Sequence, residues 1–476
     1  MKIKIISLIF LVSFLFLNTK FCFAALKPLK VSDNGRYLTT SDGNPLFLNA
    51  DTCWQIPWKL TKEEIEFYLN KRKEQKFNAI GLVAFAMERV ATNVYGDHPF
   101  TISDGKYNPL SPIIKKEYDY WDHIEHIIDS AANKGIYIIL LPTWGSRVAG
   151  DYRTGKSYSA LIFDEKKAYK YGKWIAERYK NKNNIIWMLG GDRNAVMGKY
   201  DYRNVFNSLA KGLIAGSGNK KILISYHPRK WQPNSSAWFH NESWLSFNSI
   251  QDGPIDQMKA INYDLNLQPK KPTWLFEGGY EGRTRTGGYV YKDWQVRLQA
   301  YQTVFAGAFG ETYGNMSIWD FKSDWKKRID DPGANQLCHL VYLMSLLSKE
   351  QYLGRVPDQS LLSGDTGKMT GCEGMLSSLL TATRTKKGDL AMIYSANGGN
   401  ITLKMHLLKG PKMYAYWFNP RTAQWGIRGK QIDKITPFKS NIRSGKRAEN
   451  YQFDAPDSPG NANDWVLILS NKKLKT

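Results

Sequence analysis

Cysteine is scarce in this chain, and the scarcity limits how the fold can be stabilised. Only four of the 476 residues are Cys. Cys22 lies in an N-terminal segment that we expect to be removed, and an odd number of cysteines cannot all pair within one chain. We therefore predict a fold that depends on its hydrophobic core, without a disulfide framework. The remaining cysteines are Cys53, Cys338 and Cys372.

The sequence also lacks the patterns that bind cofactors, metals or nucleic acid. No glycine-rich phosphate loop follows the first predicted strand, which disfavours a doubly wound nucleotide-binding sheet. Histidine is rare, with seven residues in the chain. His123 and His126 have helical spacing that suits a metal, but their helix lies outside the predicted barrel ring. We expect no metal site, no cofactor and no nucleic-acid partner.

Long apolar runs are absent after the N-terminus, so we expect no stable membrane insertion. Residues 1–24 have the features of a signal peptide: Lys2 and Lys4 precede the apolar run 5–17, and the segment ends at Ala24. A retained membrane anchor is the alternative, but the run is short for spanning a bilayer. These features predict export to the periplasm, the extracellular space or the cell surface.

Acidic residues are outnumbered by basic ones, which gives a formal net charge of +23 at pH 7. The signal segment contains three of the lysines and no acid, so the mature chain has a charge of +20. A basic protein attracts polyanions. Outside the cytoplasm this favours an acidic polysaccharide or oligosaccharide as partner, while solubility alone is the competing explanation.

Residues 25–350 alternate between short β-rich runs and segments of helical periodicity. Eight such alternations predict a closed (β/α)8 barrel, the TIM-barrel class of α/β fold. Thr61 and Glu64 form a capping box that begins the first of the helices. The predicted strands are 45–53, 77–85, 135–144, 184–190, 221–227, 246–251 and 273–277, with the eighth somewhere in 309–318.

Residues 351–476 have a different pattern. Short β-rich runs are separated by turn sequences such as Lys387-Gly388-Asp389. We predict a small antiparallel β-sandwich that packs rigidly on the barrel, because no long linker precedes it. Its predicted strands are 379–383, 389–394, 401–405, 413–418 and 465–469.

Polar groups at the carboxyl ends of the barrel strands mark the candidate active site, since catalytic residues of such barrels lie there. Asp192 follows strand four and Glu277 ends strand seven. Two opposed carboxylates are what glycosidic bond cleavage requires. We predict Asp192 as the acid/base and Glu277 as the nucleophile. Glu281 is an alternative nucleophile, and an ion pair with Arg193 is the alternative role for Asp192.

Further side chains near the same rim are candidates for binding substrate. Charged and amide groups can bind sugar hydroxyls, and aromatic faces can stack on sugar rings. Each also has a structural alternative: a packed strand-end or core residue, or a loop cap in the case of Asp51. The candidates are Asp51, Trp54, Trp144, Arg193, His227, Gln251, Tyr280 and Trp319.

Several segments are specific when they are taken together. They include Asp51-Thr52-Cys53-Trp54, Leu141-Pro142-Thr143-Trp144-Gly145, Gly190-Gly191-Asp192-Arg193 and Thr312-Tyr313-Gly314-Asn315. With these segments the chain resembles the apiosidase-like family, glycoside hydrolase family 140, followed by a domain of the collagen-binding type. The resemblance covers nearly the whole mature chain. It implies a barrel hydrolase with its acid/base at Asp192 and its nucleophile at Glu277. The stretch Phe276-Glu277-Gly278 departs from the Gly-Glu-Pro pattern that is frequent in the family.

These observations predict an exported, retaining glycoside hydrolase that acts on a plant or bacterial polysaccharide. The resemblance adds a specific candidate activity, the release of apiose from pectin side chains. Two alternatives are kept. One is an endo-acting hydrolase on an acidic exopolysaccharide, and the other is a non-catalytic glycan-binding surface protein, because a fold alone does not determine a function.

Overall fold

The computed structural model describes residues 26–150, 161–218, 220–230, 234–251, 254–284, 288–370, 376–410, 412–427 and 429–475. The predicted signal peptide and Cys372 lie outside these residues. Among the described helices, none is both long enough and apolar enough to cross a bilayer.

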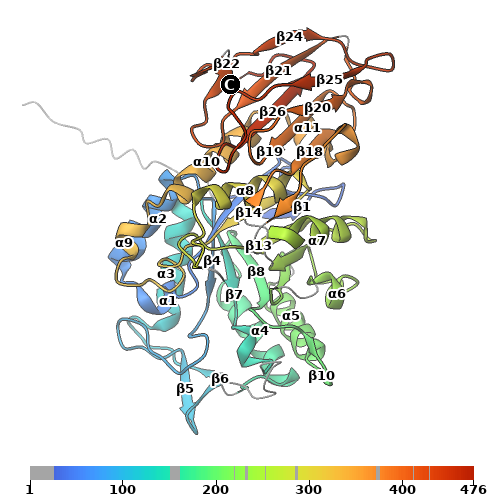
Figure 1. The fold of residues 1–476 in the computed structure, drawn as a ribbon. Helices are drawn as coiled ribbons and strands as arrows, with labels where there is room; N and C mark the ends of the chain where they lie inside the picture. Colours follow the sequence, from blue (N-terminus) through green and yellow to red (C-terminus); the bar gives the residue numbers. More distant parts are fainter. Residues whose placement is uncertain are drawn as a thin grey trace, which may run out of the picture.

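Eight parallel strands form a closed barrel, which confirms the predicted fold class (Figure 1). Six of them pair in the order β11-β8-β7-β4-β3-β14, and β12 pairs with β13. Two backbone hydrogen bonds connect these groups, from Ser246 to Ile224 (2.8 Å) and from Phe309 to Thr273 (3.1 Å). The strands are β3 (Leu48–Thr52), β4 (Ala79–Val83), β7 (Tyr137–Leu141), β8 (Ile185–Gly190), β11 (Ile224–His227), β12 (Asn248–Gln251), β13 (Thr273–Glu277) and β14 (Gly310–Tyr313).

The apolar content of these strands explains why they lie inside the ring. All five residues of β4 and all five of β7 are buried. Strands that are covered on both faces read as continuous apolar runs, with no alternation between polar and apolar residues. Each predicted barrel strand matches an observed one, and the uncertain eighth strand is β14.

Helices surround the barrel and mostly begin where the sequence predicts. The capping box of α2 is present: the Thr61 hydroxyl accepts from the Glu64 amide, and Glu64 accepts from the Thr61 amide, both at 3.3 Å. Helix α7 was not predicted from the sequence. The surrounding helices are α2 (Lys62–Glu74), α3 (Tyr120–Asn133), α4 (Glu165–Arg178), α5 (Arg203–Gly216), α7 (Pro254–Asn266), α8 (Asp293–Phe305) and α10 (Pro332–Ser345).

Shorter elements decorate the barrel. A hairpin of two strands projects from it after β4 (Figure 1). These elements are β1 (Leu29–Val31), β2 (Leu38–Thr40), β5 (Phe100–Ser103), β6 (Lys106–Pro112), β9 (Val196–Met197), β10 (Tyr200–Asp201), α1 (Ile56–Lys59), α6 (Ser236–Phe239), α9 (Trp325–Arg328) and α11 (Lys349–Gly354).

The C-terminal region is built on an antiparallel sheet of eight strands (Figure 1). Its strands are β15 (Arg355–Pro357), β18 (Leu380–Thr385), β19 (Leu390–Ser395), β26 (Trp465–Ser470), β21 (Met413–Phe418), β22 (Trp425–Ile427) and β23 (Lys430–Ile432), with β24 (Lys439–Ile442) beside β21. Two smaller pairs are β20 (Ile401–Lys404) with β25 (Asn450–Phe453), and β16 (Met369–Thr370) with β17 (Leu376–Ser377).

Both faces of this sheet are buried, and alternate residues of β19 show how. Ile393 belongs to a core that also contains Ile401 and Phe453 of the β20–β25 pair. Its neighbours Met392 and Tyr394 belong to the core that continues into the barrel. Successive side chains of a strand point to opposite faces. The sheet therefore serves as a layer shared between the C-terminal core and the barrel.

Helix α8 carries the polar part of this contact. The Tyr301 ring stacks on Tyr394 at 5.1 Å between centroids. Arg297 donates to both carboxylate oxygens of Asp464, at 3.0 Å from Nε and 2.9 Å from Nη2. Both side chains are almost fully buried, and the Asp464 charge raises the pKa of Arg297 against the opposing effect of burial. A buried bidentate pair of this kind fixes the orientation of the two parts.

We expect Asp464→Asn to lower the free energy of unfolding by up to about 3–5 kcal/mol, because the buried Arg297 charge then retains only the more exposed Asp293 carboxylate, at 2.9 Å, as its counter-charge. Urea unfolding followed by tryptophan fluorescence measures this. The matched control is Glu350→Gln, which breaks the exposed Lys387–Glu350 pair and leaves the free energy of unfolding nearly unchanged. Equal effects of the two changes would contradict a structural role for the buried pair.

Candidate active site

An open cleft of about 620 Å³ contains both predicted catalytic carboxylates. It is at the end of the barrel where the strands finish, as expected for enzymes with this fold. Its volume is within the range of pockets that bind small molecules. The lining residues are Trp54, Gln55, Trp58, Ala86, Met87, Glu88, Arg89, Trp144, Asp192, Glu277, Tyr280, Arg283, Met316 and Trp319.

A tight turn after β8 brings Asp192 to the cleft. Asp192 itself has a left-handed backbone (φ 54°), following Gly190 (φ 79°) and Gly191 (φ 118°). A Cβ on Gly191 would lie 2.6 Å from the ring of Trp144. Glycine is therefore required at Gly191 both by its backbone angle and by this close packing. Non-glycine residues with positive φ are uncommon and tend to occur at functional sites.

Asp192 is in surroundings that favour its protonated form. Burial raises its pKa, and the negative charge of Glu277 raises it further. The charges of His227, Arg193 and Arg229 oppose this effect in part. A carboxyl group that faces a second carboxylate in a poorly solvated place retains its proton to higher pH. This is the property that a proton donor needs near neutrality.

Glu277 is held from behind by His227. The His227 Nε2 atom lies 2.8 Å from the Glu277 Oε2 atom. His227 is fully buried and stacks on Trp54, with 5.8 Å between ring centroids and 22° between planes. Since a carboxylate only accepts hydrogen bonds, we assign a proton to the Nε2 atom of His227, which makes His227 the donor. His227 therefore orients the Glu277 carboxylate through a hydrogen bond from a buried position.

Tyr280 supplies a second fixed group beside Glu277. The Trp54 indole N–H donates to the Tyr280 hydroxyl at 2.8 Å. Burial raises the pKa of Tyr280 well above its ordinary value, and the charge and hydrogen bond of Glu277 raise it further. The phenol therefore stays neutral, with its O–H available to Glu277. Glu277 is thus aligned by two donors.

Four predicted substrate-binding residues do not line the cleft. One is His227, which is buried and contacts Glu277. Asp51 is fully buried on the α2 side of its strand, where it accepts from Tyr68 (2.5 Å) and Arg72 (2.6 Å). Arg193 donates to the backbone carbonyl of Asp192 at 2.9 Å. Gln251 pairs in register with Glu277 but is buried at the end of β12. A strand-end position therefore did not determine which way these side chains point.

Glu281, the alternative nucleophile, is likewise buried away from this cleft. It accepts from the Tyr313 hydroxyl at 2.6 Å and from the Gly333 amide at 3.1 Å. Gly333 is in the first turn of α10, so Glu281 connects the end of the barrel to that helix. Of the two acidic residues after β13, Glu277 alone is on the cleft wall.

Loops just beyond the strand ends contribute lining residues that were not predicted from the sequence. Arg89 follows β4, Arg283 follows β13, and Glu88 lies 3.7 Å from Arg193. The feature of the sequence that could have identified them is their position, a few residues after a predicted strand. Such loops form the binding sites of barrel enzymes. The other unselected lining residues are Gln55, Trp58, Ala86, Met87 and Met316.

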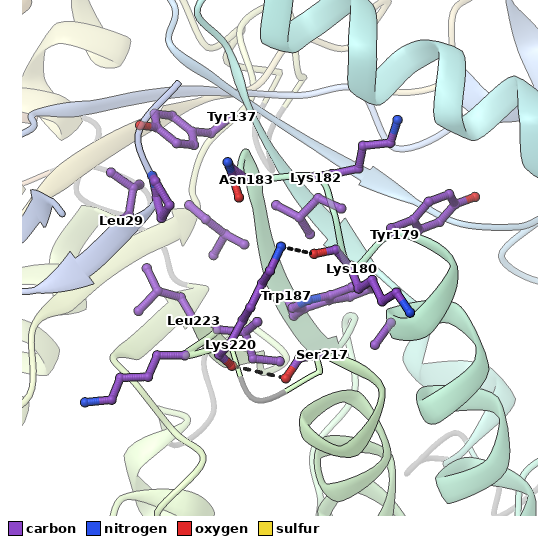
Figure 2. Close-up of a pocket in the computed structure, with 16 residues that line it drawn as sticks. Leu29, Tyr137, Tyr179, Lys180, Lys182, Asn183, Trp187, Ser217, Lys220 and Leu223 are labelled. Atoms are coloured by element: carbon purple, nitrogen blue, oxygen red, sulfur yellow. Dashed lines mark hydrogen bonds between the residues drawn. The ribbon is translucent and has the colours of Figure 1, made fainter. Parts of the chain in front are cut away.

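A second hollow, of about 360 Å³, is at the opposite end of the barrel, near the starts of β7, β8 and β11 (Figure 2). Lysines surround it, and the ammonium group of Lys220 donates to the Lys180 carbonyl at 2.6 Å. Its described lining residues include no carboxylate. This hollow therefore lacks the acid pair that the chemistry requires.

His123 and His126 are the two histidines whose spacing on one helix would suit a metal ion. The buried His123 ring contacts the Leu60 carbonyl at 3.0 Å, and Tyr118 at 2.9 Å. Within the described part of the chain, no group of three or more His, Cys, Asp or Glu side chains is placed to hold a metal ion. Both ring nitrogens of His123 therefore already take part in hydrogen bonds within the protein.

A (β/α)8 barrel with a carboxylate pair in an aromatic-lined cleft places the protein among the glycoside hydrolases. Residues 32–351 match the family described as "Apiosidase-like, catalytic domain", and residues 356–470 match "Putative collagen-binding domain of a collagenase". The chain belongs to the apiosidase-like family.

Two solved structures are similar over nearly the whole chain. One is a glycoside hydrolase family 5 protein from Bacteroides vulgatus (29% identity, 93% of this chain and 94% of the other, TM-score 0.79). The other is described as a glycoside hydrolase (29% identity, 94% of this chain and 98% of the other, TM-score 0.78). None of the curated proteins compared with the chain matches it significantly.

The alkaline limb of the pH profile should report the ionisation of Asp192. We expect kcat/KM to fall only as pH rises through a value above 3.8, the ordinary pKa of Asp, because burial and Glu277 raise the pKa of Asp192. Measuring kcat/KM between pH 3 and 9 checks this. Activity that is lost as soon as pH exceeds about 4 would contradict a protonated Asp192 in the working enzyme.

Proposed function

We propose that the protein is an exported, retaining glycosidase that removes a branch sugar from an acidic polysaccharide, with apiose on pectin side chains as the leading candidate. The observation that supports it most directly is that the two carboxyl groups of the cleft have different surroundings. Asp192 is partly buried and its pKa is raised, while Glu277 accepts from His227. Such separation of paired groups assigns the acid and the base of a reaction.

In the proposed mechanism a carboxylate oxygen of Glu277 attacks the anomeric carbon. As the glycosidic bond breaks, the proton of Asp192 moves to the leaving oxygen and a glycosyl-enzyme ester forms. Asp192, now ionised, takes a proton from water, and the oxygen of that water displaces Glu277. Two inversions leave the anomeric configuration unchanged. His227 and Tyr280 keep Glu277 oriented in both steps.

The other cleft residues support a substrate that is both cyclic and anionic. Trp58, Trp144 and Trp319 provide aromatic faces on which sugar rings can stack. Arg89 and Arg283 line the same cleft, and a guanidinium pairs well with a carboxylate such as that of a uronic acid. The strongly basic chain adds a favourable long-range field for such a polymer.

An endo-acting hydrolase of an acidic exopolysaccharide is the second candidate, favoured by the open form of the cleft. Product length on a polymer separates the two. A branch-removing enzyme releases single sugars and leaves the backbone length unchanged, whereas an endo-acting enzyme shortens the polymer early. Export is tested by the N-terminal sequence of the secreted protein, expected at or near residue 25.

We expect Asp192→Asn and Glu277→Gln each to reduce kcat by about 10²–10⁴-fold or more, because each removes a group that acts in the transition state. A panel of pectic and bacterial polysaccharides, with analysis of the released sugars, identifies the substrate for this measurement. Proton NMR of the first-formed sugar then gives its anomeric configuration, which is expected to match that of the bond cleaved.

Glu88→Gln is the matched control, since it neutralises a carboxylate of the same cleft that has no assigned step. It should leave kcat within a few-fold of the wild type. Full activity in either catalytic variant would contradict the assignment. Inverted configuration of the product would contradict the retaining mechanism. Saturable binding without any released sugar would support the non-catalytic alternative.

A further inference from the structure

A polar network lies directly behind the segment that carries Glu277. The Gln299 Oε1 atom, on α8, accepts from the Gly279 amide at 2.7 Å and from the Tyr291 hydroxyl at 3.1 Å. A backbone N–H can only donate, so this contact fixes which end of the Gln299 amide faces the segment. The Nε2 group then points the other way, to Glu311 Oε1 at 3.3 Å.

Close packing of this segment requires glycine at both positions after Glu277. A Cβ on Gly278 would lie 2.3 Å from the Gln299 side chain, and one on Gly279 would lie 2.4 Å from the Tyr291 ring. Neither glycine has a positive φ, so close approach explains them and backbone freedom does not. The segment after the nucleophile is therefore pressed against α8, with Gln299 as its support.

Glu311 completes the network from β14 and is fully buried. The groups that act on it are Gln299, Thr303 and the backbone of Thr312, and none of them is charged. Its Oε2 atom has no hydrogen-bond partner among the described residues. Burial raises the pKa of Glu311 to about 8. At neutral pH Glu311 is thus an uncharged acid without an ion pair, and a hydrocarbon side chain would fill the same place at lower cost.

We propose that Glu311 is a positioning residue for Glu277, acting through the Gln299 amide on the Gly278–Gly279 segment. The inference rests on the proposed role of Glu277 as nucleophile. Gln257 also donates to the Gln299 Oε1 atom, at 3.3 Å, so Oε1 has three donors while Nε2 depends on Glu311. Without the Glu311 acceptor, the Nε2 end of the amide is released and the amide can tilt away from the Gly279 N–H. The segment loses its support and the Glu277 oxygen moves relative to the anomeric carbon.

Glu311→Leu should therefore lower kcat by about 10- to 100-fold with little change in KM, because a shift of about 1 Å at a reacting group can cost on the order of 10²-fold. Glu311→Gln, an uncharged isostere that still offers an oxygen to Gln299, should keep kcat within about three-fold of the wild type. Stopped assays on the substrate found in the screen give both constants.

Asp264→Asn is the matched control. Asp264 is another buried carboxyl group, with a pKa raised to about 6, and it accepts from Ser236 at 2.5 Å. Its partners Ser236, Asn234 and Thr273 are outside the Gly278–Gly279 segment, and Thr273 is at the opposite end of β13 from Glu277, so its replacement should leave kcat nearly unchanged. If Glu311→Leu does not fold, Gln299→Met removes the same acceptor from Gly279 and is expected to reproduce the loss of kcat.

The protonation of Glu311 has its own readout, independent of activity. Between the ordinary Glu pKa of 4.5 and about 8, the folded protein retains a proton that the unfolded chain has lost. The stability of the wild type relative to Glu311→Gln should therefore decrease as pH rises through this window. Thermal unfolding of the two proteins from pH 4 to 9 measures the difference.

The outcomes separate this inference from the proposed function. If Glu277→Gln abolishes activity while Glu311→Leu and Gln299→Met both keep the wild-type kcat, the positioning role is wrong and the nucleophile stands. Equal losses in Asp264→Asn and Glu311→Leu would also overturn it, since a general effect of disturbing buried acids would then explain the result. Full activity in Glu277→Gln would overturn the proposed function itself.

Discussion

The site depends on one electrostatic constraint: two carboxyl groups share a cleft, and the negative charge of Glu277 favours the protonated form of Asp192. The protein meets this constraint by placing the two carboxyl groups in different surroundings. Asp192 is partly buried on a left-handed turn after β8, where both low solvation and the charge of Glu277 favour its proton. Glu277 ends β13, where His227 donates to it at 2.8 Å. The aromatic residues beneath the cleft keep this arrangement fixed, since His227 stacks on Trp54 and Trp54 donates to Tyr280.

The rest of the molecule gives this site a rigid base. The C-terminal sheet shares the hydrophobic core of the barrel, and the Arg297–Asp464 pair joins it to α8. The same helix carries Gln299, which supports the segment after Glu277. Helix α8 therefore connects the C-terminal sheet to the nucleophile. This arrangement gives the C-terminal region a structural task in the enzyme, beside any affinity for glycan.

The sequence predicted the barrel well because its strands are buried on both faces and read as unbroken apolar runs. It predicted Asp192 and Glu277 because strand ends converge on one rim of such a barrel. It did not predict the direction of a strand-end side chain: Asp51 turns toward Arg72 on α2. Gln299 and Glu311 become neighbours through tertiary packing, which leaves no local pattern in the chain.

The most direct test of the account is the ionisation of Asp192 itself, followed by carbon-13 NMR titration of labelled aspartate side chains in the wild type and in Glu277→Gln. The account predicts a pKa above the ordinary 3.8 in the wild type and a lower value in the variant, because the charge that Glu277 contributes is then gone. An ordinary pKa in the wild type, or the same pKa in both proteins, would contradict the coupling of the two carboxyl groups across one cleft.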